Sequence, residues 1–353
     1  MKTCSFITLF AITAGVAACL PRYEDAPLTV TGEAPVGWSP PAGSVLGGAD
    51  GGASGDAGAA AGTPSKCAGT VPDLATAAKN RSYPCSITNL DLTTSTAGQS
   101  LGYAALVTTV YNLRISNATQ MASLKQIKQI GNFNAENFND ATLYLADHVV
   151  ITEAIAIYGK LQNITGFLGV SQLTSQLVIA NSPNLTKISG FTNLVKVGAI
   201  EIRGVPKLVS LAAFSKLNQI QSSTMSDVQS GSVALPVLPA TTINHVSIQN
   251  FGGISQLNLF YNATQISFMT FQQMPNLARV DIPKLATVSG FTLIDIGKMV
   301  NLDSFGPSVQ VYGGLTVCGT PMTGATLEAW RKAHATNLQF SKCPNGCTGG
   351  ECP

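Results

Sequence analysis

Two aspartates and one arginine are the residues of this sequence whose types and spacing could support acid–base chemistry. Asp281 and Asp303 lie 22 positions apart, and Arg279 comes two residues before the first of them. If the chain repeats its path at about this interval, the two carboxylates fall on neighbouring repeats, as a pair acting on a glycosidic bond requires. Two aspartates one repeat apart on an exposed face also arise by chance. A carbohydrate-active enzyme is therefore the less favoured alternative, and we expect no catalytic residue.

The remaining side chains predict neither a metal centre nor a cofactor site. His148, His245 and His334 are far apart in sequence, and none belongs to a short metal-binding motif. Motifs for a serine nucleophile, a phosphate-binding loop or a dinucleotide are also missing from the sequence. The chain carries 20 basic and 18 acidic residues, a formal net charge of +2. Since binding to nucleic acid requires a basic surface, we expect no nucleic-acid partner.

The first residues indicate export. Lys2 precedes an apolar stretch that is too short to span a membrane and is typical of a secretory signal. Small residues then lead to Cys19 in an order that resembles a bacterial lipobox, so we expect residues 1–18 to be a signal peptide and Cys19 to carry lipid. An ordinary signal peptide, with Cys19 incidental, is the alternative. Because Leu20 follows instead of aspartate, the resemblance implies lipid anchoring at the outer membrane or cell surface.

The segment that follows Cys19 has the composition of a linker. Residues 19–66 are rich in glycine, alanine, serine and proline. Such a segment cannot bury enough apolar surface to offset the entropy that ordering would cost, so we expect a flexible tether. The folded domain is expected to occupy residues 67–353, at some distance from the membrane.

Six cysteines gather near the two ends of residues 67–353, and none lies between Cys85 and Cys318. An exported chain meets an oxidising compartment, which favours disulfides. Six cysteines allow 15 pairings, and proximity in sequence favours one pair at the N-terminal end and two at the C-terminal end. A zinc site formed by the last three cysteines is the disfavoured alternative, since no histidine lies among them. The expected pairs are Cys67–Cys85, Cys318–Cys343 and Cys347–Cys352.

Apolar residues recur in this chain at an interval of 23 positions. From Leu185 to Val197 they fall at every third position, which is the period of neither a strand nor a helix. A repeat of 20–50 residues indicates a solenoid, in which each copy buries its apolar side only by stacking on the next. The two clearest copies are Ile179, Pro183, Leu185, Ile188, Phe191, Leu194 and Val197, followed by Ile202, Pro206, Leu208, Leu211, Phe214, Leu217 and Ile220.

A 23-residue rung is too short for a pair of helices and fits short strands joined by bends, so we expect a mainly β solenoid. Asparagines mark the expected corners, because asparagine tolerates the left-handed conformation. The polar run 219–232 interrupts the apolar rhythm and is expected to form a loop. The corner asparagines form two sets with common offsets, Asn117, Asn181 and Asn250, and Asn184, Asn276 and Asn301.

The open ends of a solenoid expose strand edges that invite aggregation, so caps are expected at both. The N-terminal cap is placed at residues 67–100 and the C-terminal cap at residues 318–353. Within the second cap, residues 323–335 read as a short amphipathic helix with Leu327 and Trp330 on one face. Disulfides would staple both caps.

The segments "NLTKISGFTNLVKVGAIEIRG" (184–204) and "VSGFTLIDIGKMVNLDSF" (288–305), with "GLTVCGTP" and "LEAW" near the end, resemble the receptor L-domain, the leucine-rich ligand-binding lobe of insulin and epidermal growth factor receptors. The resemblance covers roughly residues 85–345. It implies a right-handed β-helix-like solenoid that binds something outside the cell, with Cys318 and Trp330 in the closing strand and helix. The chain has more residues between these two than is usual in the family, and it lacks the receptors' Cys-rich, transmembrane and kinase parts. Ordinary leucine-rich repeats are the nearest alternative.

Taken together, these patterns predict a non-enzymatic binding or adhesion lipoprotein that presents its solenoid to an extracellular glycan or protein. The extended surface of a solenoid and the tether favour this interpretation. A purely structural envelope protein is the alternative. The residues that make the repeat are those expected to be buried, so the sequence singles out no ligand-binding residue.

Overall fold

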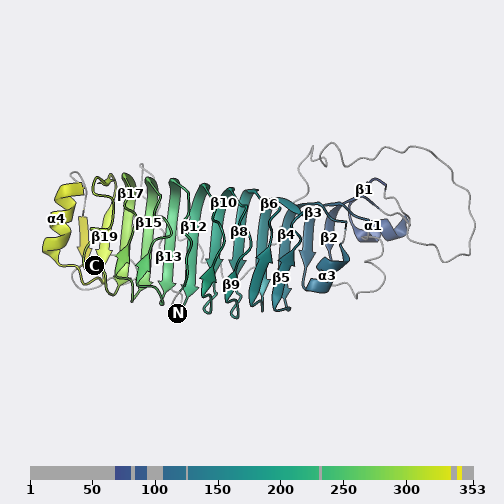
Figure 1. The fold of residues 1–353 in the computed structure, drawn as a ribbon, viewed down its shortest axis with the longest axis horizontal. Helices are drawn as coiled ribbons and strands as arrows, with labels where there is room; N and C mark the ends of the chain where they lie inside the picture. Colours follow the sequence, from purple (N-terminus) through teal and green to yellow (C-terminus); the bar gives the residue numbers. More distant parts are fainter. Residues whose placement is uncertain are drawn as a thin grey trace, which may run out of the picture.

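The computed structural model describes residues 68–80, 84–93, 106–124, 126–229, 233–334 and 340–343. Over these residues the chain winds into a parallel β-solenoid of about nine turns, with rungs about 23 residues apart. Figure 1 shows the strands stacked along one axis, with α1 (Leu74–Lys79) at one end and α4 (Gly324–His334) at the other. The mainly β solenoid and its period are therefore confirmed.

Several predicted features lie outside the described residues. They include the signal peptide (1–18), the tether (19–66) and about a third of the N-terminal cap, namely residues 67, 81–83 and 94–100. The described part of that cap contains β1 (Thr70–Val71), α1 and β2 (Ser86–Asp91). No helix in the described part of the chain is long and apolar enough to cross a membrane. The cysteines outside the described residues are Cys4, Cys19, Cys67, Cys347 and Cys352.

One large sheet runs the length of the solenoid, and every strand pairing in it is parallel. Within the described residues it has 14 strands, of which β18 (Gln310–Val311) pairs only with β17. Parallel strands succeed one another because each rung returns the chain to the same face. The others, in spatial order after β1 and β2, are β3 (Thr109–Ile115), β4 (Gln129–Phe138), β6 (Val150–Gly159), β8 (Gln172–Ala180), β10 (Lys196–Arg203), β12 (Gln219–Val228), β13 (Thr242–Phe251), β15 (Gln265–Met274), β17 (Thr287–Ile296), β19 (Leu315–Cys318) and β20 (Phe340–Cys343).

Shorter strands form other parts of the rungs. A four-stranded sheet contains β5 (Thr142–Leu145), β7 (Asn163–Gly166), β9 (Lys187–Ile188) and β11 (Ser210–Leu211), and a two-stranded sheet contains β14 (Gln256–Leu257) and β16 (Arg279–Val280). Helix α3 (Ala118–Ser123) lies between β3 and β4 in the chain. The rungs therefore share one long sheet and differ in the shorter strands and the helix that complete each turn.

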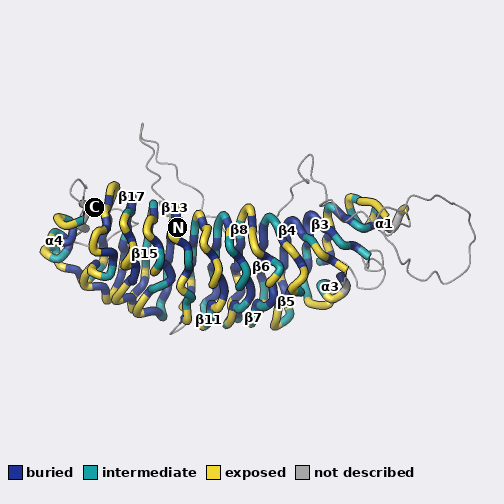
Figure 2. Tube along the Cα trace, turned by 45° about the horizontal axis from the view of Figure 1, so that its top comes forward, coloured by how far each residue is buried: buried dark blue, intermediate teal, exposed yellow. Residues whose placement is uncertain are grey.

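The apolar residues of the repeat line the inside of the solenoid, as predicted. The residues at every third position of one copy, from Leu185 to Val197, are all at most 2% exposed. Figure 2 shows buried and exposed stretches alternating along each rung. Burying large aliphatic and aromatic side chains at roughly 1.5–3 kcal/mol each supplies the main force that stacks the rungs. The three-residue rhythm therefore traces a chain that bends around a core.

Phenylalanine rings stack through this core from rung to rung. Phe191 lies between Phe167 and Phe214, with ring centroids 4.5 Å and 6.0 Å away. All three residues have positive φ, between 61° and 67°, which is uncommon for an aromatic residue. This backbone conformation costs about 1–2 kcal/mol per residue. Burial of the rings offsets that cost, so packing decides the backbone conformation at this corner.

A second corner, at the C-terminal ends of the strands of the large sheet, carries one residue of positive φ in each of nine successive turns. We call this set the left-handed corner. Asn181 and Asn250 belong to it with φ of 48° and 49°, which confirms the prediction for these two asparagines. Positive φ is adopted most easily by glycine, asparagine and aspartate, and least easily by residues with a β-branched side chain. The full set is Asn137, Gly159, Asn181, Gly204, Asp227, Asn250, Gln273, Asp295 and Gly319.

The other corner asparagines do not adopt the left-handed conformation, although Asn184 and Asn276 do lie in turns. Asn117 is extended, with φ −157°, and its side chain caps α3 by accepting a hydrogen bond from the Gln120 N–H at 3.0 Å. A helix begins here in place of a tight bend, so asparagine serves as an N-cap. The second set of asparagines has no positive φ within the described residues. In that set, Asn276 instead donates to the carbonyl of Gly252 at 2.7 Å.

The polar run 219–232 is not a loop, because its first ten residues form β12. Ile220, Met225 and Val228 point into the core and are at most 5% exposed, while Ser223 occupies a core position and is 1% exposed. Because a serine occupies an inward position, the polarity of this segment does not reveal that it forms a strand. At the C-terminal end the helix is confirmed, since α4 buries Leu327 and Trp330.

Candidate binding site

The two aspartates considered for catalysis occupy different surroundings. Asp281 is 6% exposed, and its carboxylate accepts hydrogen bonds from Gln256 and Arg279. Asp303 is exposed, and its backbone N–H donates to Asn301. No hydrogen bond between described residues links the two aspartates. The contacts of Asp281 join two neighbouring rungs, which is a structural role.

The three histidines also lie apart. His148 is exposed, and His334 stacks on Trp330 at a centroid distance of 4.7 Å. His245 lies on β13 and is half-buried. Nowhere in the described ranges do three histidine, cysteine, aspartate or glutamate side chains gather as a metal site would require.

His245 gives one pH-dependent prediction. Burial lowers its pKa in the folded protein, whereas the unfolded chain has a histidine pKa of about 6.5. Below that pH the unfolded state binds more protons, so we expect the free energy of unfolding to decrease as pH falls from 6.5 toward the folded pKa. Urea unfolding of wild type and His245→Gln at several pH values measures this, and the variant should lose part of the slope. His148→Gln is the exposed control, and an equal slope change in both variants would contradict the assignment.

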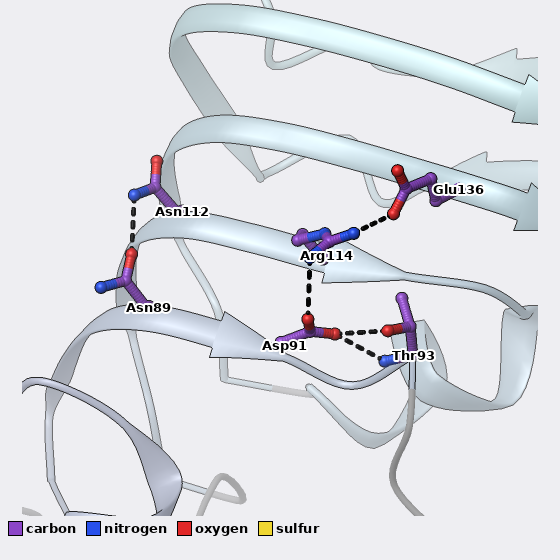
Figure 3. A network of polar contacts seen from close by, with 6 residues as sticks. All are labelled: Asn89, Asp91, Thr93, Asn112, Arg114 and Glu136. Atoms are coloured by element: carbon purple, nitrogen blue, oxygen red, sulfur yellow. Dashed lines mark hydrogen bonds and ion pairs between the residues drawn. The ribbon is translucent and has the colours of Figure 1, made fainter. Parts of the chain in front are cut away.

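Side chains that point away from the core on the large sheet form what we call the outer face. Near its N-terminal end, Arg114 on β3 lies between Asp91 on β2 and Glu136 on β4 (Figure 3). Arg114 Nη1 lies 3.0 Å from Asp91 Oδ2, and Nη2 contacts Glu136. The bond to Glu136 raises the pKa of Arg114 and outweighs the opposing effect of burial. This charged network therefore ties three successive rungs together.

A column of amides runs beside the charged network. Asn112 Nδ2 donates to Asn89 Oδ1 at 2.7 Å, as Figure 3 shows, and Asn132 Nδ2 donates to Asn112 Oδ1 at 3.0 Å. Glu153 on β6 ends the column, accepting from Asn132 at 3.3 Å and from the Tyr111 hydroxyl at 3.0 Å. Burial, followed by the bond to Glu153, raises the pKa of Tyr111. Because these polar groups bond to one another, the column mainly joins rungs.

Farther along the outer face, β8 to β13 border a hollow of about 600 Å³. We call it the polar groove and define it by the eight exposed polar side chains that line it. Val197 and Ile220 lie at its floor and belong to the core. Gly198 also lines it, and a Cβ there would lie 2.4 Å from the Ser175 carbonyl oxygen, so close packing of rungs requires glycine. The eight side chains are Thr174, Lys196, Asn218, Gln219, Gln221, Thr241, Thr242 and Asn244.

The chemistry of the polar groove is that of neutral hydrogen bonding. Its amides and hydroxyls both donate and accept, and Lys196 supplies a positive charge. These groups are exposed and can exchange water for a ligand. They are poorly suited to acid–base catalysis near neutral pH, since amides and simple hydroxyls do not titrate there. The arrangement can bind a polar, largely uncharged molecule.

The charged network and the polar groove were not predicted from the sequence. A usable signal exists, since Asn89 and Asn112, like Asp91 and Arg114, are separated by the 23-residue period. It was missed because the repeat was traced through apolar positions, which face inward. The polar positions vary from rung to rung and so do not show a repeat by themselves.

Comparison of the chain with protein-family models, with curated proteins and with solved structures gives no match. We therefore infer the function from the residues and their arrangement.

Proposed function

We propose that this protein is a non-enzymatic surface protein that binds an extracellular glycan along the outer face of its large sheet. The polar groove carries the proposal, because eight exposed amide, hydroxyl and ammonium side chains gather there over four neighbouring rungs. Sugars present hydroxyls that both donate and accept hydrogen bonds, so amides and hydroxyls are matching partners.

Other ligand classes fit the groove less well. Nucleic acid requires several basic side chains along its path, and Lys196 is the one basic residue among those that border the hollow in the described structure. The centre of a protein interface is usually enriched in aromatic residues and depleted in charge. The residues around this hollow are mainly small and polar, which favours a carbohydrate over a protein.

The wider proposal places the solenoid outside the cell, as a relative of receptor L-domains held by lipid on Cys19 at the outer membrane. The wider proposal also includes disulfides at both ends of the solenoid. The register of β19 and β20 supports the predicted Cys318–Cys343 pair, because it places these two residues opposite each other. Labelling with a fatty-acid analogue, which should mark wild type and leave Cys19→Ser unmarked, tests the anchor.

Binding of the purified full-length protein to an array of glycans tests the function. We expect Gln219→Ala combined with Gln221→Ala to weaken binding about tenfold, since two hydrogen bonds of about 0.5–1.5 kcal/mol each are lost. The matched control is Gln162→Ala, an exposed glutamine that precedes β7 and lies away from the groove. A wild-type protein that binds no glycan would refute the proposal, and equal binding by all variants would refute the groove.

A further inference from the structure

Four apolar side chains on the outer face are shielded from solvent. In the C-terminal halves of β6 and β8 every second residue belongs to the core, so the residues between them point outward. Four of these outward residues form an apolar cluster separate from the core, and each is at most 8% exposed. We call this cluster the covered patch. Its members are Ala156, Tyr158, Val178 and Ala180.

Neighbouring rungs do not account for the shielding of the covered patch. In the register, Val178 is followed by Glu201 on β10 and Thr224 on β12, and both of these are half-buried although they have neighbours on either side. Val178 itself is fully buried. Among the described elements, β6 and β8 mainly contact strands of the same sheet. The covered patch therefore requires an additional cover on the outer face.

A buried acceptor lies beside the covered patch. Asn134 on β4 is opposite Ala156 in the register, so its side chain shares the outer face. Asn134 is 4% exposed, and its Oδ1 accepts no hydrogen bond from the described residues. A buried acceptor without a donor is destabilising, so the cover is expected to supply one. The backbone of a docked segment carries such donors in its N–H groups.

Most segments outside the described residues are unsuitable as the cover. Residues 94–105 lie between β2 and β3, whose register advances by the usual 23 residues from Ser86 to Thr109, so they are needed to close that rung. The other internal segments have at most five residues. Residues 344–353 contain no large apolar side chain. The N-terminal part of the chain is therefore the remaining source of a cover.

The expected tether contains two unlike parts. Residues 27–38, "PLTVTGEAPVGW", include three large aliphatic side chains and one of the chain's two tryptophans. These side chains can bury apolar surface against the covered patch. Residues 39–67 consist mainly of glycine, alanine, serine and proline, a composition typical of a flexible linker.

The length of residues 39–67 matches the distance that they must span. The described chain starts next to β1, and β8 is five strand pairings away along the large sheet. At 4.7–4.9 Å for each pairing, this distance is about 24 Å. A flexible chain of 29 residues has a root-mean-square end-to-end distance of about 27–32 Å. Residues 27–38 therefore reach the covered patch without stretching the linker.

We propose that residues 27–38 fold back and dock on the covered patch, where one of their N–H groups donates to Asn134 Oδ1. The occupant of this face is then a segment of the same chain. With Cys19 as the proposed lipid anchor, the seven residues 20–26 would remain free between the lipid and the docked segment. They span at most about 25 Å, so docking would hold the solenoid close to the membrane.

Digestion of the purified protein with a glutamate-specific protease tests the docking, because Glu33 lies inside the segment. Val178→Glu places a charge on the covered patch without entering the core. Cleavage after Glu33 should be about tenfold faster in this variant than in wild type, since cleavage follows the undocked population. Thr224→Glu is the matched control, because it lies two rungs away in the same outward row and should be cleaved as slowly as wild type. Circular dichroism checks that both variants are folded.

A converse variant tests the segment itself. Replacing residues 28–38 with an equal number of glycines and serines should increase hydroxyl-radical labelling of Tyr158 severalfold. Tyr144, which is 54% exposed on β5 in the four-stranded sheet, should be labelled equally in both proteins.

Three outcomes would overturn the docking. They are equal cleavage of Glu33 in wild type and Val178→Glu, unchanged labelling of Tyr158 when the segment is replaced, and protection of Glu33 that is lost on dilution. The last would show that a second copy of the chain supplies the segment. Neither measurement involves a glycan, so failure of the docking leaves the proposed function standing, and the reverse also holds.

Discussion

Replacing Phe191 with alanine is expected to lower the free energy of unfolding by about 3–5 kcal/mol. The side chain is fully buried, and its ring packs between those of Phe167 and Phe214 in the centre of the solenoid. Neighbouring rungs cannot close over the cavity, because strand spacing fixes their distance. Urea denaturation followed by far-ultraviolet circular dichroism measures the change.

Phe268→Ala is the matched control for this prediction. It removes the same atoms from a residue that is 50% exposed, so the expected change in the free energy of unfolding is below about 1 kcal/mol. Similar losses in both variants would show that the phenylalanine stack has no special role. Broadening of the Phe191→Ala transition would indicate that the rungs on either side unfold separately.

Replacing Gly159 with alanine is expected to be about as costly as the loss of Phe191. Gly159 has φ of 148°, and an added Cβ would lie 2.3 Å from the Phe138 carbonyl oxygen and 2.4 Å from the Phe138 nitrogen. These are backbone atoms of β4, so they cannot rotate away. The strained conformation costs about 1–3 kcal/mol, and the overlap adds about 1–3 kcal/mol. Thermal and urea unfolding of the variant measure the sum.

Gly204 supplies the control at the same corner of another rung. Its φ is 61°, and the nearest atom to an added Cβ is 3.1 Å away. Gly204→Ala should cost about 1–2 kcal/mol. Gly204→Asn should cost less, since asparagine occupies this corner at Asn181 and Asn250. An equal loss for Gly159→Ala and Gly204→Ala would mean that β4 moves to accommodate the new side chain.

Much of the fold could be predicted because the core is repetitive. Each rung buries apolar residues at the same offsets, so Phe191 and Phe214, which are 23 residues apart, occupy equivalent positions on neighbouring rungs. The corner at Asn181 and Asn250 could be predicted for a chemical reason, the tolerance of asparagine for positive φ. Helix α4 could be predicted because a solenoid end requires a cover and Trp330 supplies an apolar face.

The binding site could not be predicted, because outward residues obey no common rule. Phe268, Gly290 and Ser222 occupy comparable outward positions on different rungs and share no chemistry. Their neighbours become known only when the register is known, and a one-residue slip reverses every side chain. The same uncertainty explains why the segment that forms β12 was predicted to be a loop and why Asn117 was predicted to be a corner.

The charged network has a mechanical consequence. Hydrogen bonds between rungs run along the axis of the solenoid. A force that pulls on one end of the chain therefore breaks the hydrogen bonds of the terminal rung first and separates the rungs one after another. Arg114 holds both Asp91 and Glu136, so separating β2 from β3 requires breaking an ion pair in addition to the backbone ladder. The ion pairs of Arg114 therefore strengthen the contacts between rungs near the N-terminal end, where a force applied to that end would begin to separate them.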